Sequence, residues 1–160
     1  MTPGEYNRTV DQFSDHIYRF VLKSMGDTGR AEDVVQDCYE KLWLNVTEID
    51  FSKAKAWLFT TAYNRMIDII RREKRVVSEE EFSVEMQYFD EYSDLNEILH
   101  SCLEKLPEKW KSVILLRDYE GYSYSEIASI TGLSDAQVKI NIYRGRLALR
   151  SMIGKIEAVV

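Results

Sequence analysis

The side chains with the clearest chemical use lie on one predicted helix near the C-terminus. Its buried stripe is predicted by four residues at helical spacing: Val138, Ile142, Gly145 and Leu149. Because successive residues of a helix turn by about 100°, Ile140 points roughly away from that stripe. The side chains that flank it are cationic or aromatic: Lys139, Tyr143 and Arg144. This combination suits the major groove of DNA, where apolar groups meet thymine methyls and cations reach guanine edges or phosphates.

Two consecutive capping boxes must position that helix. They occupy residues 123–126 and 134–137, and each places a hydroxyl three residues before a carboxyl or amide side chain. The helix between them is only about two turns long, and Gly132 supplies the turn because the backbone needs a positive φ there. A short helix, a turn with glycine and a long basic helix predict a helix-turn-helix over 120–150 that reads double-stranded DNA. The alternative is a solvated basic helix packed on a small bundle.

A second group of binding side chains lies on the helix predicted from about Lys53 to Lys74, which Ser52 is expected to cap. Four of its residues face the core: Leu58, Ala62, Met66 and Ile69. Another side carries an aromatic ring, hydrogen-bonding groups and cations: Trp57, Thr61, Asn64, Asp68, Arg71 and Arg75. Such a side suits single-stranded nucleic acid, because bases stack on rings while phosphates meet arginines. Trp57 could equally be mainly a core residue, and the arginines could be an ordinary solvated run.

A third helix, predicted from about Arg30 to Val46 and capped by Asp27 or Thr28, has an acidic face. Its apolar stripe consists of Ala31, Val34, Val35, Cys38 and Leu42. The stripe leaves acidic and hydrogen-bonding side chains on or beside the exposed face: Asp33, Gln36, Asp37 and Glu40. Such a face suits a basic protein partner, or it is an ordinary solvated surface.

The composition excludes several classes of protein. The chain has 160 residues, of which 45% are hydrophobic, with seven Gly and two Pro, so long helices and an all-α fold are expected. It has no Cys/His cluster with metal spacing, no Gly-rich phosphate loop and no nucleophile elbow. We therefore expect no metal, no cofactor, no small-molecule substrate and no enzymatic activity. Without a membrane span or signal peptide the protein should be cytoplasmic, with Cys38 and Cys102 as buried, reduced thiols.

The net charge of −6 hides a segregation of charge along the chain. Residues 76–97 contain eight acidic side chains and no Lys or Arg, and subtracting these eight charges leaves +2 for the rest. Five basic residues lie within 62–75 and five within 135–156, on either side of the acidic segment. We therefore predict two small helical domains, 1–75 and 94–160, joined by an acidic linker, 76–93.

Local signals mark the remaining helix ends. Thr2, Pro3 and Glu5 open the first helix with a cap, a proline at the first position and a capping-box glutamate. Two further helices are expected: one opened by Asp94 with Glu97 that ends near Leu106, and one from Pro107 to about Tyr119, which Gly121 stops.

The predicted helix-turn-helix resembles region 4 of the extracytoplasmic-function (ECF) sigma factors of bacterial RNA polymerase. The resemblance covers 106–150 and is carried by the run 115–128, by Val138 with Lys139, and by Arg144 and Arg146. The first half of the chain resembles region 2 of the same family, with 31–37 similar to region 2.2. The residues that resemble regions 2.3 and 2.4 are Lys55, Ala56, Trp57, Leu58, Asn64, Asp68, Arg71 and Arg72.

The resemblance implies a group IV sigma factor that binds core RNA polymerase and directs initiation at promoters with −35 and −10 elements. It implies that the helix-turn-helix contacts −35 DNA through Gln137, Lys139, Ile140, Asn141, Tyr143, Arg144 and Arg146. It implies −10 contacts, beside a pocket for a flipped base at 49–53, from Lys53, Trp57, Thr61, Asn64, Arg71, Arg72 and Arg75. It implies that the coiled coil of the polymerase largest subunit is bound by Asp33, Gln36, Asp37 and Glu40.

The resemblance also implies further partners. Region 4 would pack on the polymerase flap, the free protein would be a monomer, and an anti-sigma factor would hold it inactive. Ile140 and Asn141 stand where many relatives carry Ser and Arg, so the promoter sequence itself is not predicted.

Several alternatives stay open at this point. The acidic linker, which also carries four aromatic residues, could mimic RNA in a polymerase channel, could serve only as a solubilising tether, or could fold onto the basic helices and block DNA. Two other functions compete with that of a sigma factor. One is an autonomous helix-turn-helix repressor that binds an operator as a dimer, although no heptad seam for self-association is present. The other is a regulator that binds polymerase but no promoter.

Overall fold

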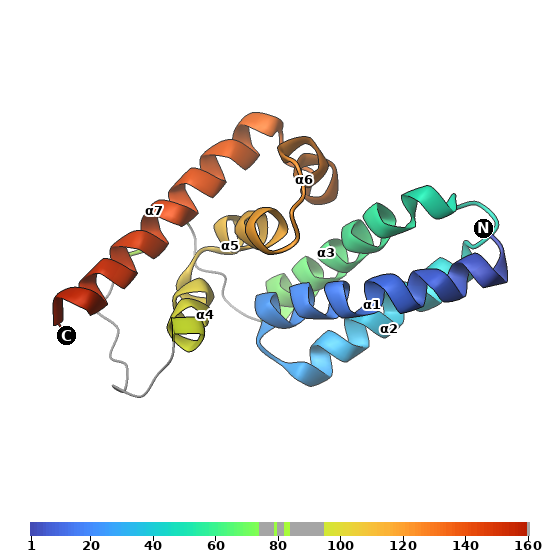
Figure 1. Cartoon of the computed structure of the whole chain (residues 1–160), viewed down its shortest axis with the longest axis horizontal. Helices are drawn as coiled ribbons and strands as arrows, with labels where there is room; N and C mark the ends of the chain where they lie inside the picture. The colour runs from blue at the N-terminus through green and yellow to red at the C-terminus, as the bar shows by residue number, and fades with distance from the viewer. Residues whose placement is uncertain (74–78, 80–81, 84–94, 160) are drawn as a thin grey trace.

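The computed structural model describes residues 1–73, 79, 82–83 and 95–159, and this part of the chain forms helices and turns without a strand. Figure 1 shows the helices in two groups. The first group contains α1 (Pro3–Met25), α2 (Thr28–Leu44) and α3 (Ala54–Glu73). The second group contains α4 (Leu95–Lys105), α5 (Glu108–Ile114), α6 (Tyr124–Thr131) and α7 (Asp135–Val159). The predicted all-α fold with two helical domains is confirmed.

The first two helices begin where their local signals predict. The Thr2 hydroxyl accepts a hydrogen bond from the backbone N–H of Glu5 at 3.1 Å, and Pro3 occupies the first position of α1. Asp27, rather than Thr28, caps α2, because its carboxylate accepts from the backbone N–H of Arg30 at 3.0 Å. These caps satisfy backbone donors that the first turn of a helix leaves unpaired.

The predicted cap of the third helix is wrong. Asp50 caps a single 3-10 turn, η1 (Phe51–Lys53), and α3 begins only at Ala54. The Asp50 carboxylate accepts from both the backbone N–H and the hydroxyl of Ser52, each at 3.1 Å. Because Asp50 takes up both donors of Ser52, the serine hydroxyl is oriented toward Asp50 and not toward the start of α3.

The second group departs from the prediction at one element. The helix expected from Pro107 to Tyr119 is divided into α5 and a π-helical turn, η2 (Leu115–Tyr119), in which Glu120 N–H donates to Leu115 O at 3.1 Å. Gly121 follows with a φ of 76°, a conformation that favours glycine, and the chain turns there as predicted. Asp94, the predicted start of α4, lies outside the described residues.

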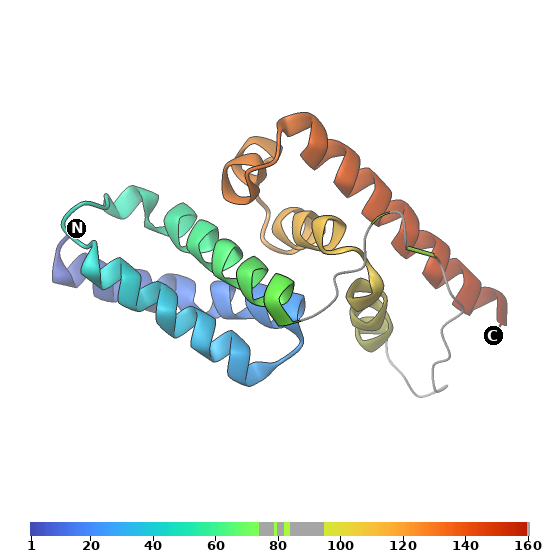
Figure 2. The ribbon, with the colours of Figure 1, turned by 180° about the vertical axis from the view of Figure 1, so that it is seen from behind.

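The two groups share one hydrophobic core. Phe59 of α3 lies between Phe20 of α1 and Tyr122 of the second group, with ring centroids 5.7 Å and 5.2 Å apart. The view from behind in Figure 2 shows α5 and α6 beside the bundle of α1 to α3, and α6 contacts α3 directly. We call this arrangement, in which α6 of the second group packs against α3 of the first, the closed arrangement.

The structure also bears on the cysteines, on metal binding and on membrane spans. Cys38 and Cys102 are buried free thiols, as predicted, and burial raises the pKa of Cys38 to about 12. Within the described ranges, no group of three or more His, Cys, Asp or Glu side chains could hold a metal ion. No helix in that part of the chain is long and apolar enough to cross a membrane.

Candidate nucleic-acid interface

Both predicted capping boxes form and frame a helix-turn-helix. The Ser123 hydroxyl accepts from the Glu126 N–H at 3.1 Å, and the Glu126 carboxylate accepts from the Ser123 N–H at 3.0 Å. Ser134 and Gln137 make the same reciprocal pair at 3.1 Å and 2.9 Å. Gly132 ends α6 with a φ of 78°, as predicted. Gln137, a predicted DNA contact, is exposed, but its carboxamide oxygen is used by the cap.

The predicted buried stripe of α7 is confirmed, since all four of its residues are buried. Gly145 lies where α7 packs tightly against α5. A Cβ at this position would lie 2.3 Å from Ile114 Cδ1 and 3.2 Å from Trp110 Cβ. Any side chain there would overpack the contact, so the glycine determines how near α7 lies to α5.

The opposite side of α7 presents most of the predicted DNA-binding side chains to solvent. Ile140 is 43% exposed and Tyr143 is 63% exposed, and Lys139 and Arg144 are exposed beside them. Asn141 is the exception, because it is only 4% exposed. Three residues after Val138, it lies at the edge of the buried stripe, so its burial argues against the predicted contact with DNA.

Two arginines of α7 are already paired within the chain. Arg146 donates to the carboxylate of Asp118 from Nε at 3.2 Å and from Nη2 at 2.5 Å, and these hydrogen bonds raise the pKa of Arg146. Arg144 Nη1 donates to Glu79 Oε2 at 3.3 Å. Both pairs are at the surface, where ion pairs contribute little to stability and can be exchanged for other anions.

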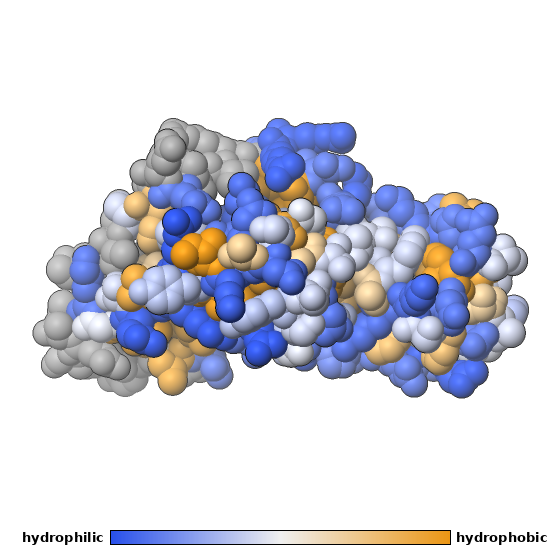
Figure 3. Space-filling view, turned by 90° about the horizontal axis from the view of Figure 1, so that it is seen from above, coloured by the Kyte–Doolittle hydropathy of each residue, from blue (hydrophilic) through white to orange (hydrophobic). Residues whose placement is uncertain are grey.

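A groove beside these arginines contains residues that the sequence did not suggest. Its volume is about 360 Å³ and its lining is Tyr124, Lys139, Ile142, Tyr143, Arg146, Leu147 and Arg150. Leu147 is 48% exposed. Leu147 and Arg150 each follow a predicted contact by four residues, and that spacing could have identified them. Figure 3, the view from above, shows small hydrophobic patches among hydrophilic side chains.

The predicted strand-binding side of α3 is open to solvent. Asn64, Arg71, Arg72 and Lys53 are exposed, and Arg71 and Arg72 have no ion-pair partner in the described part of the chain. Trp57 is half-buried against the core, so it keeps part of its ring available. Thr61 is half-buried as well, and its hydroxyl donates to the Trp57 carbonyl at 2.8 Å. Arg75 lies outside the described residues.

The predicted acidic face of α2 is mostly exposed. Asp33, Gln36 and Glu40 face solvent, whereas Asp37 is half-buried and pairs with Arg65 Nε at 3.3 Å. The same surface continues into two apolar residues that the sequence reasoning missed, Trp43 and Leu44, which are 49% and 74% exposed. Leu44 follows Glu40 by four residues, so helical spacing could have found it.

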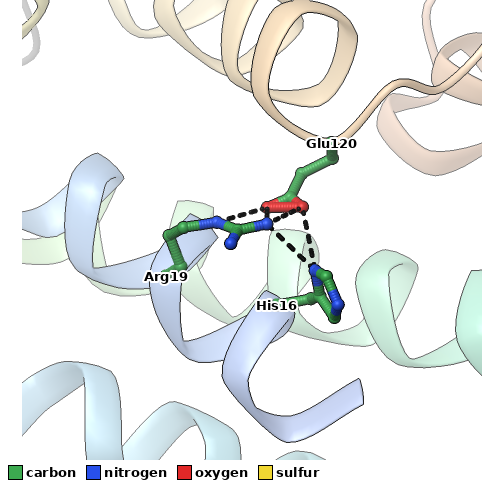
Figure 4. Close-up of polar contacts among 3 residues, drawn as sticks. All are labelled: His16, Arg19 and Glu120. Atoms are coloured by element: carbon green, nitrogen blue, oxygen red, sulfur yellow. Dashed lines mark hydrogen bonds and ion pairs between the residues drawn. The ribbon is translucent and has the colours of Figure 1, made fainter. Parts of the chain in front are cut away.

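A partly buried ion pair joins the first group of helices to the start of the helix-turn-helix (Figure 4). Arg19 of α1 donates to the Glu120 carboxylate from Nε at 3.2 Å and from Nη2 at 2.8 Å. His16 Nδ1 lies 3.6 Å from the same carboxylate, whose side chain is only 3% exposed. Hydrogen bonding to Glu120 raises the pKa of Arg19. The pair connects residues 101 positions apart, so no local pattern predicts it.

Comparison with known proteins identifies the family of the chain. The model of Sigma-70 region 2 matches residues 9–76, and that of Sigma-70, region 4 matches residues 96–149. The ECF RNA polymerase sigma factor SigL of Mycobacterium tuberculosis is 31% identical over 148 residues, which cover 88% of this chain and 84% of SigL. SigM of Bacillus subtilis, another ECF sigma factor, is 26% identical, covering 92% of this chain and 96% of SigM.

Solved structures show the same architecture. The sigma factor RpoE of Bartonella quintana, crystallised with the anti-sigma factor NepR, matches with a TM-score of 0.75 and 25% identity over 93% of this chain and 96% of RpoE. CnrH shares the fold, with a TM-score of 0.71. With a helix-turn-helix after an acidic-faced helical bundle, and with matches to regions 2 and 4 in order, the chain belongs to the ECF sigma factors, which bind core RNA polymerase and direct promoter-specific transcription initiation.

Proposed function

We propose that α7 reads the duplex −35 element through its exposed face. The observation that carries this proposal is the placement of Ile140 and Tyr143, exposed between Lys139 and Arg144, on the second helix of a helix-turn-helix. Lys and Arg reach guanine edges or phosphates, and the apolar groups meet thymine methyls. Gln137 and Arg146 flank this face and complete the set. A wrong base pair in the −35 element should cost about 1–3 kcal/mol.

We propose that the open side of α3 captures the −10 strand as the duplex melts. Melting costs roughly 1.4 kcal/mol per base-pair step, and strand capture must offset this. Trp57 supplies a stacking surface, and Thr61 and Asn64 lie along the same side. Three cations hold the phosphates: Lys53, Arg71 and Arg72. The loop 49–53 at the start of α3 accepts a flipped base.

We propose that α2 docks the protein on core polymerase. Its exposed carboxylates, Asp33 and Glu40 with Gln36 between them, suit the basic surface expected of the largest-subunit coiled coil. Trp43 and Leu44 extend the contact with apolar area, and the helix-turn-helix domain packs on the polymerase flap. Asp33→Lys with Asp37→Lys should weaken polymerase association in a pull-down, and retained affinity would disprove this assignment.

We propose that the closed arrangement opens when both elements are bound. Positions −35 and −10 are about 25 base pairs apart, which at 3.4 Å per base pair is about 85 Å along the duplex. In the closed arrangement α6 lies against α3, and opening that contact lets the two binding faces move apart toward elements with this separation. The domains 1–75 and 94–160 therefore separate, and the linker 76–93 spans the gap.

We propose that the free protein is a cytoplasmic monomer without catalytic activity, of the group IV class, and that an anti-sigma factor controls it. The likeness to RpoE, whose structure contains an anti-sigma factor, supports the last point. An anti-sigma factor would have to cover at least one of the three faces, because each is open in part.

Reconstituted transcription tests the proposed function directly. The full-length protein would be added to core polymerase with a library of promoter sequences, and the initiated transcripts would be sequenced. The expected result is initiation from a subset that shares −35 and −10 motifs. Lys139→Ala with Arg144→Ala should abolish selection at −35; unchanged promoter specificity would instead favour a regulator that binds polymerase without reading DNA.

A further inference from the structure

An acidic side chain from the linker contacts the DNA-reading face of α7. Glu79 Oε2 accepts a hydrogen bond from Arg144 Nη1 at 3.3 Å, and Glu79 Oε1 accepts from the indole Nε1 of Trp110 at 3.1 Å. One carboxylate thus bridges α5 and α7. The Arg144 side chain remains 48% exposed and that of Glu79 36% exposed. Both charged groups can therefore exchange their partner for an anion that arrives from solvent.

An aromatic contact anchors the same segment. Phe82 lies three residues after Glu79 and packs against the ring of Trp110, with centroids 5.1 Å apart and planes at 73°. Trp110 is only 8% exposed, and its indole N–H can only donate, so its burial requires an acceptor. Glu79 is that acceptor. The contact therefore has two independent parts, an edge-to-face ring pair and a shared carboxylate.

The packing of α5 on α7 positions Trp110 beside Arg144. Gly145 is the next residue after Arg144, and a Cβ there would lie 3.2 Å from Trp110 Cβ. Because the two helices approach so closely, the indole is part of the buried core beneath the DNA-reading face. The docking point for Glu79 and Phe82 is consequently part of the packed core of the helix-turn-helix domain.

We propose that Glu79 and Phe82 form an intramolecular latch that occupies Arg144 in the free protein and releases it when α7 binds promoter duplex. The latch rests on the proposed role of Arg144 in reading −35 DNA. A carboxylate offers a guanidinium the same kind of anionic oxygen acceptors as a phosphate, and guanine offers two acceptors in the major groove. Glu79 and DNA therefore compete for the donors of Arg144. The latch lowers the affinity of the free protein for DNA. Part of the acidic linker thus folds onto a basic helix and blocks DNA binding.

Glu79→Gln is the discriminating variant. The glutamine oxygen can still accept from Trp110, whereas the charge opposite Arg144 is removed. The full-length protein would be titrated, by fluorescence anisotropy at low salt, onto a duplex carrying the −35 element that its holoenzyme selects from a random library. Exposed ion pairs are weak, so we expect binding to become about 2- to 5-fold tighter. Phe82→Ala should change affinity in the same direction, because it removes the anchor.

A double-mutant cycle with Arg144→Ala separates the latch from a general effect of charge. In that background Glu79→Gln should no longer tighten binding, and a gain as large as in the wild type would overturn the latch. If Arg144→Ala binds the duplex as tightly as the wild type, the proposed role of Arg144 fails and the latch fails with it. If Arg144→Ala weakens binding but Glu79→Gln gives no gain in the wild type, only the latch fails.

The Trp110 indole N–H gives a second readout that does not depend on affinity. Its NMR resonance should shift in Phe82→Ala and, in the wild type, on saturation with the same duplex, since release of Glu79 changes its acceptor. A Trp110 resonance that stays in place when the duplex is bound would show that Glu79 remains docked, and would overturn the proposal.

Discussion

The two cationic faces of this protein differ in what their charges contact before DNA arrives. On α3, Arg71 and Arg72 are exposed and have no ion-pair partner among the described residues. On α7, Arg144 pairs with Glu79 and Arg146 with Asp118. A phosphate that binds Arg144 or Arg146 must therefore displace a carboxylate, whereas no described carboxylate has to be displaced from Arg71 or Arg72. The net gain in binding free energy from each of these arginines is consequently expected to be smaller on α7 than on α3.

The faces also differ in their uncharged groups. The ring on α3 is Trp57, half-buried against the core, which suits a fixed stacking platform. The apolar groups on α7, Ile140 and Tyr143, protrude into solvent, which suits insertion into a groove. The proposed roles fit this difference: the fixed ring of α3 suits an opened strand, whereas the protruding groups of α7 suit an intact duplex and two of its arginines are neutralised by their own chain.

The largest effect is expected on the α3 face, where Arg71 and Arg72 have no ion-pair partner among the described residues. Arg71→Ala with Arg72→Ala removes two charge-assisted contacts to phosphate, each worth about 1.5–3 kcal/mol, so open-complex formation should fall by 100-fold or more, on the order of 3 kcal/mol. Permanganate reactivity of unpaired thymines would measure it. Lys105→Ala with Lys109→Ala removes the same charge from exposed positions on α4 and α5. An equal loss in that control would mean that total charge, not the α3 face, is responsible.

The next effect tests whether Trp57 stacks on a base. Trp57→Ala should weaken binding of the holoenzyme to a single-stranded −10 oligonucleotide by about 1–3 kcal/mol, and Trp57→Phe should keep most of the affinity. Thermal unfolding of both variants distinguishes a core role. If Trp57→Ala lowers Tm by several degrees and leaves strand binding unchanged, the residue belongs to the core. The α3 face would then lack the stacking ring that distinguishes it from the α7 face.

A smaller effect is expected from the apolar reader of α7. Ile140→Ala removes part of an exposed side chain and should cost about 1 kcal/mol of −35 binding, near the value for one or two methylene groups. The preference for thymine at one position of the −35 motif should weaken at the same time. Library-selected motifs for the wild type and the variant would reveal it. Leu95→Ala is the matched control, because this residue is also exposed but lies on α4, outside the proposed −35 contacts.

The smallest effect tests the pairing on α7. Asp118→Asn frees Arg146 from a surface ion pair worth about 0.2–1 kcal/mol, so affinity should rise slightly and equally for all duplex sequences. The salt dependence should become steeper, because a freed arginine contacts one more phosphate and releases its counterion. Plots of log affinity against log salt would measure the slope. An unchanged slope would indicate that Arg146 never reaches the backbone, and the α7 face would then be smaller than proposed.

Much of the helix-turn-helix could be predicted because its signals are local. The capping boxes at Ser123 and Ser134 join residues three positions apart, and Gly132 is needed by a single backbone angle. Asn141 shows the limit of this reasoning. Helical phase places it at the margin of the buried stripe, and whether a marginal residue is covered depends on the helix that packs there. Similarly, Ser52 has a capping side chain, but Asp50 competes for it within the same turn.

Most of the helices, the buried stripe of α7 and the residue types on the three faces follow from the sequence, because periodicity and caps act over one or two turns. Which charges are paired with one another depends on the tertiary structure. Arg19 with Glu120 and Glu79 with Arg144 join residues 101 and 65 positions apart. No local pattern carries such pairs, because they depend on how the two groups of helices and the linker meet. The contrast between an open α3 face and a partly neutralised α7 face follows from those long-range contacts.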